Sequence, residues 1–169
     1  ALPILAGILS GRINPSGKLA MTFPYSTGQI PIYYNRRKSG RGHQGFYKDI
    51  TSDPLYPFGH GLSYTEFKYG TVTPSVTKVK RGDRLSVEVT VTNVGARDGA
   101  ETVHWFISDP YCSITRPVKE LKHFEKQLIR TGETKTFRFD IDLERDFGFV
   151  NEDGKRFLET GEYNIHVLE

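Results

Sequence analysis

The sequence predicts an all-β domain, an immunoglobulin-like β-sandwich of about seven strands over residues 64–169. Three observations predict it: apolar and polar residues alternate in short runs, turn residues separate the runs, and no helical period intervenes. Alternation of this kind places one face of each strand in a core. The clearest runs are 85–92, 103–108, 137–143 and 163–167, and turn signals lie at 93–95, 109–110, 131–133 and 153–154.

Shorter runs complete the expected sandwich. Strands are expected near 67–72 and 121–129, with a short one near 147–150. Trp105 is expected to be a core ring. Tyr163, which follows Gly161 and Glu162, resembles a tyrosine corner, in which the phenol bonds back to the chain. Both are packing features and predict no chemistry.

Residues 1–35 follow a different pattern. Apolar residues repeat at helical spacing over 2–9, and Gly11 stands where a helix end favours a left-handed residue. A turn is expected at 14–17 and a short strand from Lys18 to Phe23. A helix end and one strand cannot bury their own apolar faces. We therefore expect the sequence to begin within a domain whose other layers lie elsewhere.

Residues 36–63 are expected to be a long connection. The stretch 28–63 holds six glycines and shows no helical or alternating pattern over most of its length. Connections of this length are usually functional or lie along an interface. Aromatic side chains are expected to pin it down, namely Tyr33, Tyr34, Phe46, Tyr47, Tyr56 and Phe58.

Composition excludes several classes of protein. The 169 residues carry a net charge of +3, too small to predict a nucleic-acid partner. No apolar run approaches the roughly 20 residues of a membrane span. The single cysteine, Cys112, excludes an internal disulfide, and the five histidines show no metal-ligand spacing. The acidic run from Asp140 to Asp146 lacks the glycine of a calcium loop. We expect no cofactor and no metal.

Charge and aromatic residues nevertheless gather at one place in the connection. A basic run over 35–43 stands beside two tyrosines. Its interpretations are a solvated or domain-contacting loop, which we favour, a loop that hydrogen-bonds sugar hydroxyls, and, least favoured, a contact with a phosphate backbone. His60 and Arg116 are further candidates for contacts with a neighbouring domain. The candidate domain-junction or sugar-rim residues are Tyr33, Tyr34, Arg36, Arg37, Arg41, His43, His60 and Arg116.

Longer motifs resemble one enzyme family. YPFGHGLSYTEF at 56–67 resembles the junction motif of glycoside hydrolase family 3, the β-glucosidase and β-xylosidase family. Residues 11–35 resemble the end of its α/β-sandwich domain. The stretches 91–109, 113–126 and 131–141 resemble its C-terminal fibronectin III-like domain. The resemblance implies three parts: 1–35 as the C-terminal remnant of the α/β-sandwich domain, 36–63 as a connecting loop, and 64–169 as a fibronectin III-like sandwich.

The resemblance also implies a function for the parent protein, the hydrolysis of terminal β-linked sugars with retention. Such hydrolysis needs two carboxyl groups about 5 Å apart. In the family the nucleophile lies in an N-terminal barrel and the acid/base residue in the α/β domain, so no residue here receives a catalytic role. The chain alone is then an inactive packing module whose partners are those two domains and, through the parent, a carbohydrate.

Two further expectations follow. The resemblance implies a periplasmic or secreted protein, with no nucleic acid as partner. The alternative hypothesis is a carbohydrate-binding or protein-interaction module, which would bind through a flat row of exposed aromatics. Most aromatics on the expected strands alternate inward, but Phe106 and Phe124 are not accounted for by that pattern.

Overall fold

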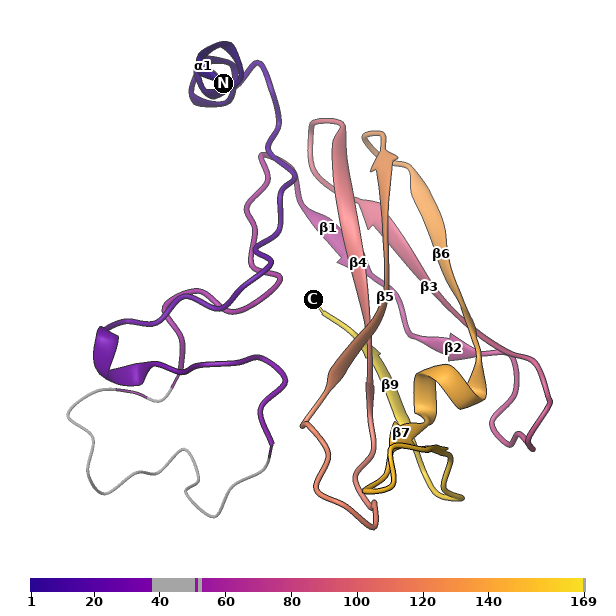
Figure 1. The fold of residues 1–169 in the computed structure, drawn as a ribbon. Coiled ribbons are helices and arrows are strands. Elements are labelled where there is room, and N and C mark those ends of the chain that lie inside the picture. The colour runs from indigo at the N-terminus through magenta and orange to yellow at the C-terminus, as the bar shows by residue number, and fades with distance from the viewer. Residues whose placement is uncertain (38–50, 52, 169) are drawn as a thin grey trace.

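A computed structural model describes residues 1–37, 51 and 53–168 of the chain (Figure 1). Strands dominate, after one short helix near the N-terminus. The helices are α1 (Leu2–Leu9), the 3-10 turn η1 (Thr27–Gln29) and the π-helical turn η2 (Leu143–Phe147). The strands are β1 (Phe67–Tyr69), β2 (Thr73–Pro74), β3 (Leu85–Asn93), β4 (Gly99–Ser108), β5 (Glu120–Ile129), β6 (Thr134–Ile141), β7 (Phe149–Val150), β8 (Arg156–Phe157) and β9 (Asn164–Val167).

These strands form open antiparallel sheets. In the first sheet β3 pairs with β6 and with both β1 and β2, and in the second β4 lies between β5 and β9. Strands β7 and β8 form a separate pair. The register of β4 against β5 shifts between Trp105 and Phe106, which marks a bulge.

One core lies between the two larger sheets. The alternating apolar residues of β3 and β6 meet those of β4 and β5 there, as the alternation predicts. Trp105 packs against Phe139 with 6.2 Å between the ring centroids, so the expected core ring is confirmed. The Tyr163 hydroxyl donates to the carbonyl of Glu159 at 2.9 Å, which matches the expected tyrosine corner. Trp105 therefore joins the two sheets, and the Tyr163 bond closes the segment that leads into β9.

Two expected strands are wrong in extent. The alternation in 137–143 suggested that β6 would continue to Leu143, but the chain turns into η2 because the Asp142 carboxylate accepts from the amide of Arg145. The Asp146 carboxylate accepts from the amide of Asp142 in return. The strand expected from Lys18 to Phe23 is reduced to a single bridge between Phe23 and Tyr56.

After helix α1, the N-terminal region consists of two irregular segments that run side by side, next to the second sheet (Figure 1). Helix α1 ends at Leu9, and Gly11 just beyond it has a positive φ of 75°, which suits a residue without a Cβ. The chain then runs alongside the returning segment 53–64. Backbone bonds join the two, including one from the Leu19 amide to the His60 carbonyl at 2.8 Å and one from the Gly59 amide to the Leu19 carbonyl at 2.8 Å.

Candidate domain-junction site

An aromatic cluster joins the N-terminal region to the second sheet. Phe106 follows Trp105 on β4, so the pleat sends it to the opposite face, away from the core. It is nevertheless 0% exposed. Tyr34 and Phe58, which stack on each other at 4.2 Å, pack edge-on against Phe106 at 5.9 and 6.3 Å. The connection thus covers this outer face, which explains why Phe106 does not fit a simple inward alternation.

A partly buried ion pair joins the same two parts. Lys18 Nζ lies 2.9 Å from a carboxylate oxygen of Glu101 on β4. That carboxylate also accepts from the Tyr69 hydroxyl at 2.7 Å. Because Glu101 is buried, its charge needs both partners. Lys18 therefore links the N-terminal region to the sandwich by a contact that the sequence pattern did not suggest.

Three basic side chains at this junction have lowered pKa values. Burial lowers the pKa of His104, and the charge of Lys18 lowers it further. Burial lowers the pKa of Lys119, whose Nζ sits 4.7 Å from the centroid of the Phe106 ring. Burial also lowers the pKa of His166, with Lys119 adding to the effect, and His166 stacks on Phe106 at 5.9 Å. The junction therefore favours neutral imidazoles.

The structure brings part of the expected basic cluster to this junction. The Arg36 carbonyl accepts from the Val118 amide at 2.9 Å, and Arg37 forms a bridge with Pro117. Tyr34 accepts a bond from the Leu121 amide at 3.4 Å, whereas Tyr33 beside it is exposed. The remaining basic residues of the run, Lys38, Arg41 and His43, lie outside the described residues.

His60 contacts Tyr56 and the segment at Leu19. Its ring is 5.1 Å from that of Tyr56, and its carbonyl accepts from the Leu19 amide. A small pocket of about 150 Å³ opens here. Its lining includes Lys18, Gly59, His60, Thr102, His104 and Leu168.

Arg116 points away from the connection and into the sandwich. Its guanidinium donates to Asp109 at 3.2 Å, to Glu120 at 2.7 Å and to the carbonyl of Phe147 at 2.7 Å. Burial acts to lower its pKa, but Glu120 and Asp109 outweigh that and raise it above the ordinary value. The side chain is only 5% exposed, and the hydrogen bonds described for it go to Asp109, Glu120 and Phe147 within the sandwich.

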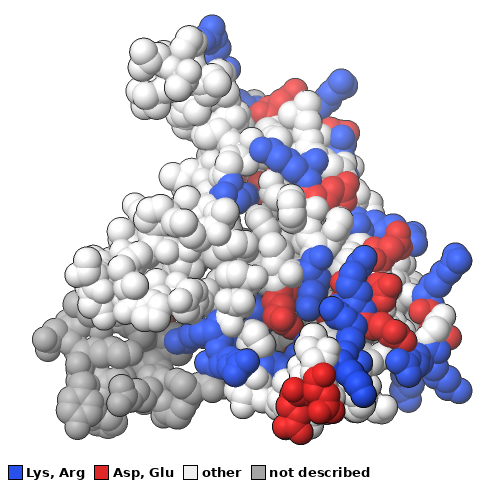
Figure 2. Space-filling model, in the orientation of Figure 1, with Lys and Arg blue, Asp and Glu red and all other residues white. Residues whose placement is uncertain are grey.

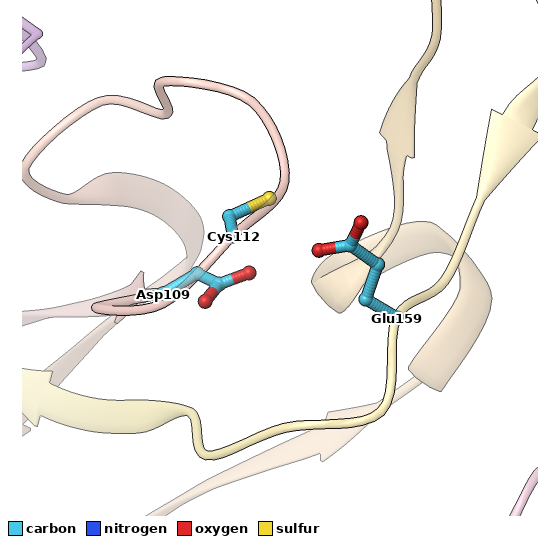
Figure 3. A group of neighbouring side chains, drawn as sticks. All are labelled: Asp109, Cys112 and Glu159. Atoms are coloured by element: carbon cyan, nitrogen blue, oxygen red, sulfur yellow. The ribbon is translucent and has the colours of Figure 1, made fainter.

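Next to Arg116, three potential metal ligands come together. Figure 3 shows Asp109 and Cys112 on the loop after β4, facing Glu159 from the segment before β9. Their ligand atoms lie within 4.8 Å of one another. Asp109 already bonds Arg116, and Glu159 accepts from the amide of Ser113 at 3.0 Å. Burial raises the pKa of the Cys112 thiol, which disfavours the thiolate that a metal requires. The group is thus explained by contacts within the protein.

The acidic run between Asp140 and Asp146 is also engaged within the chain. Arg138 contacts Asp140 at 2.8 Å, Arg81 contacts Glu144 at 2.7 Å, and Arg145 contacts Asp146 at 2.8 Å. Asp142 accepts from the Arg145 amide, as described above. The carboxylates of this run therefore form ion pairs on β6 and η2, and Asp142 caps the turn between them.

Sequence reasoning did not assign several side chains to the junction, among them Lys18, Glu101 and Phe106. Phe106 gave the one usable signal, an aromatic residue on the outward register of a strand that also carries Trp105. Lys18 and Glu101 are far apart in sequence and have no motif, so their pairing follows only from the tertiary fold.

Among the described residues, no helix is long and apolar enough to cross a membrane.

Comparisons with known proteins bear on both parts of the chain. Residues 3–64 match the glycosyl hydrolase family 3 C-terminal domain, and residues 101–169 match the fibronectin type III-like domain. The periplasmic beta-glucosidase of Salmonella typhimurium is 42% identical over 171 residues, covering 96% of this chain and 22% of that protein. A beta-xylosidase of Formosa agariphila is 39% identical over 164 residues, with coverages of 96% and 22%.

Solved structures agree with these matches. The beta-glucosidase of Listeria innocua in complex with glucose has a TM-score of 0.89 at 40% identity, covering 97% of this chain and 24% of that one. The chain thus spans less than a quarter of each of these relatives, which are larger proteins. The resemblance inferred from the motifs is confirmed. The chain corresponds to the C-terminal portion of the family 3 glycoside hydrolases, with part of their C-terminal domain followed by a fibronectin type III-like domain.

Proposed function

We propose that the chain is the C-terminal support of a retaining β-glucosidase-like hydrolase that removes terminal β-linked sugars. In this proposal both catalytic carboxyl groups lie in other parts of the longer protein. The observation that carries the proposal is the match of nearly the whole chain to β-glucosidases and β-xylosidases at about 40% identity. We further propose a periplasmic or secreted location, which the Salmonella relative's name supports.

The exposed apolar surface of the N-terminal region is evidence for a contact with another domain. Large apolar side chains stand exposed there, with Leu2 at 79%, Leu62 at 73% and Met21 at 62%. Figure 2 shows that the surface over α1 and the irregular segments carries little charge, whereas Lys, Arg, Asp and Glu crowd the strands. Large uncharged apolar patches mark interaction surfaces. The rest of the longer hydrolase is the partner that this surface fits.

The proposal divides the chain into three parts. Residues 1–35 end an α/β-sandwich domain, residues 36–63 connect, and residues 64–169 form an immunoglobulin-like sandwich of about seven principal strands. The sandwich holds the end of the first part through Tyr34 and the connection through Phe58, which both pack on Phe106. Residues that reach the domain junction or the rim of the sugar pocket would come from Tyr33, Tyr34, Arg36, Arg37, Arg41, His43 and His60, with Arg116 acting from within the sandwich.

Enzyme assays test the proposal. The longest open reading frame that contains these residues and the 169-residue chain would both be assayed with aryl β-glucoside and aryl β-xyloside. We expect the longer polypeptide to turn over at least one substrate, with retention of anomeric configuration by NMR, and the chain to match the protein-free blank. Turnover by the chain alone, or a longer polypeptide that hydrolyses neither substrate, would contradict the proposal.

A matched pair of variants in the longer polypeptide tests the support role. Phe106→Ala removes the buried ring under the connection, whereas Phe124→Ala removes an exposed ring from β5 in the same sheet. We expect the first change to shorten the half-life of activity on heating and the second to leave it unchanged. Equal half-lives for the two variants would argue against a support role for the junction.

A carbohydrate-binding module is the second candidate, and Phe124 is the observation that favours it. This ring is 64% exposed on β5 and stacks beside His104 at 6.3 Å. Titration of the chain with soluble oligosaccharides separates the candidates. Millimolar or tighter binding that Phe124→Ala abolishes would favour the module, and absence of binding would favour the support.

A further inference from the structure

We propose that Arg116 is a positioning residue: it fixes the receiving strip, defined as Pro117–Leu121, and the strip in turn holds the connection at Tyr34–Arg37. The inference deepens the support role and rests on that proposal for its meaning in the enzyme. It requires two sets of contacts, one from the Arg116 side chain to the sandwich and one from the strip to the connection. Both are present in the structure.

The Arg116 side chain ties three separate segments together. Its guanidinium donates to Asp109 after β4, to Glu120 at the start of β5, and to the carbonyl of Phe147 at the end of η2, and it lies 5.5 Å from the centroid of the Phe149 ring. The side chains of Arg116 and Asp109 are almost completely buried. Only a planar guanidinium offers several donors in a fixed fork. Near its end, the long loop between β4 and β5 is therefore held to the sandwich by the Arg116 side chain.

The receiving strip begins at the next residue and contacts residues 34–37 at several points. Pro117 bridges with Arg37, and the amide of Val118 donates to the Arg36 carbonyl at 2.9 Å. The ammonium of Lys119 covers Phe106, on which Tyr34 also packs. The Leu121 amide donates to the Tyr34 hydroxyl at 3.4 Å. The two segments are thus in contact at Pro117, Val118 and Leu121.

Arg116 acts on the connection only through the backbone of the strip. Its described hydrogen bonds all go to the sandwich, to Asp109, Glu120 and Phe147. Without that closure, the segment after β4 would have to hold the strip in place by itself, and loops without such anchors open locally at low free-energy cost. Arg116 consequently sets where Arg36 and Arg37 lie without touching them.

Amide hydrogen exchange by NMR on the 169-residue chain tests the inference. In Arg116→Gln we expect the amides of Val118 and Leu121 to exchange at least tenfold faster relative to the amides of β3 in the same sample. The Leu19 and Phe23 amides, which bond within the N-terminal region, should follow β3. A merely stabilising role would instead accelerate all of these amides by one common factor.

Two further variants keep the test decisive. Arg138→Gln is the matched control, because Arg138 is an exposed arginine that also pairs with two carboxylates, Asp140 and Glu88, on the other sheet. It should leave Val118 unchanged. If Arg116→Gln does not fold, Glu120→Gln decides, since it removes one partner and keeps the shape of the side chain, and we expect a smaller but still selective acceleration.

The result that overturns the inference is common to both Arg116→Gln and Glu120→Gln. It is an exchange rate at Val118 and Leu121 that changes no more than the rates in β3. Since exchange is measured on the chain itself, this outcome does not depend on whether the longer protein hydrolyses a β-glucoside.

Discussion

The two regions of the chain differ in what they bury. In the sandwich, Val87, Trp105 and Phe137 have no exposed surface and belong to one core. In the described residues of the first 62, the buried positions are Gly7 and Gly59, neither of which carries a side chain. Burial of apolar surface is the main favourable contribution to folding. The N-terminal region therefore lacks that contribution except where it contacts the sandwich.

This difference shows that two regions with similar aromatic content need not be equally able to fold on their own. Both regions are rich in aromatics, but the sandwich packs its rings between two sheets, whereas the N-terminal region packs Tyr34 and Phe58 onto a ring of the sandwich. Many of its other large apolar side chains, such as Leu2 and Met21, are exposed. Its order in the isolated chain thus depends on a few contacts, and each of them can be tested.

The largest effect is expected from Phe137→Ala in the core of the sandwich. Removing a fully buried ring costs about 3–5 kcal/mol in free energy of unfolding, because contacts are lost and a cavity remains. The matched change in the N-terminal region, Phe23→Ala, removes a partly exposed ring and should cost about 1 kcal/mol or less. Urea unfolding followed by the fluorescence of Trp105, the single tryptophan, measures both. Equal losses would mean that the N-terminal region has a core of its own.

A smaller effect is expected from Lys18→Met at the contact between the regions. The substitution keeps most of the side-chain length but leaves the buried Glu101 carboxylate with the Tyr69 hydroxyl as its remaining described partner. We expect a loss of about 1–3 kcal/mol, the range for hydrogen bonds to charged groups. Limited proteolysis should also cut the N-terminal region sooner while the sandwich stays intact. A variant with unchanged stability and cleavage would show that the aromatic cluster alone holds the junction.

The sandwich was largely predictable from the sequence, because alternation, turn residues and core aromatics such as Trp105 are local signals. The end of β6 was not, since Asp142 caps a turn that continues the alternation as far as Leu143. The junction was predictable only in part. Tyr34 and Arg36 were named from composition, whereas the Lys18–Glu101 pair depends on segments that meet through the tertiary fold.

A pH effect of the next smaller size is expected at the junction. Burial lowers the pKa of His104 and of His166, so the folded chain binds fewer protons than the unfolded chain as the pH falls through the ordinary histidine value. Their contribution to stability is therefore complete above the unfolded pKa of about 6.5 and is lost as the pH falls below it. Each histidine adds at most about 1.4 kcal/mol per pH unit to the slope.

Urea unfolding between pH 7.5 and 5 measures that slope, and matched variants assign it. His104→Gln and His166→Gln should each flatten it, whereas His123→Gln, at a histidine on β5 outside the junction, should not. The charged groups facing His104 are Lys18 and Glu101, which act in opposite directions, and Lys119 faces His166. A slope that survives both junction substitutions would place the pH dependence elsewhere.

The smallest effect is expected from Arg138→Ala on the outer face of the first sheet. Arg138 contacts Glu88 at 3.3 Å and Asp140 at 2.8 Å, so by contact geometry it resembles Arg116. Its side chain is exposed, however, and water screens both pairs. We expect a change within about 0.5 kcal/mol in urea unfolding, which 0.5 M salt reduces further. Burial is what distinguishes the Glu101 pair from the Arg138 pairs. A loss of free energy of unfolding as large as that of Lys18→Met would therefore mean that exposure does not decide which ion pairs stabilise this chain.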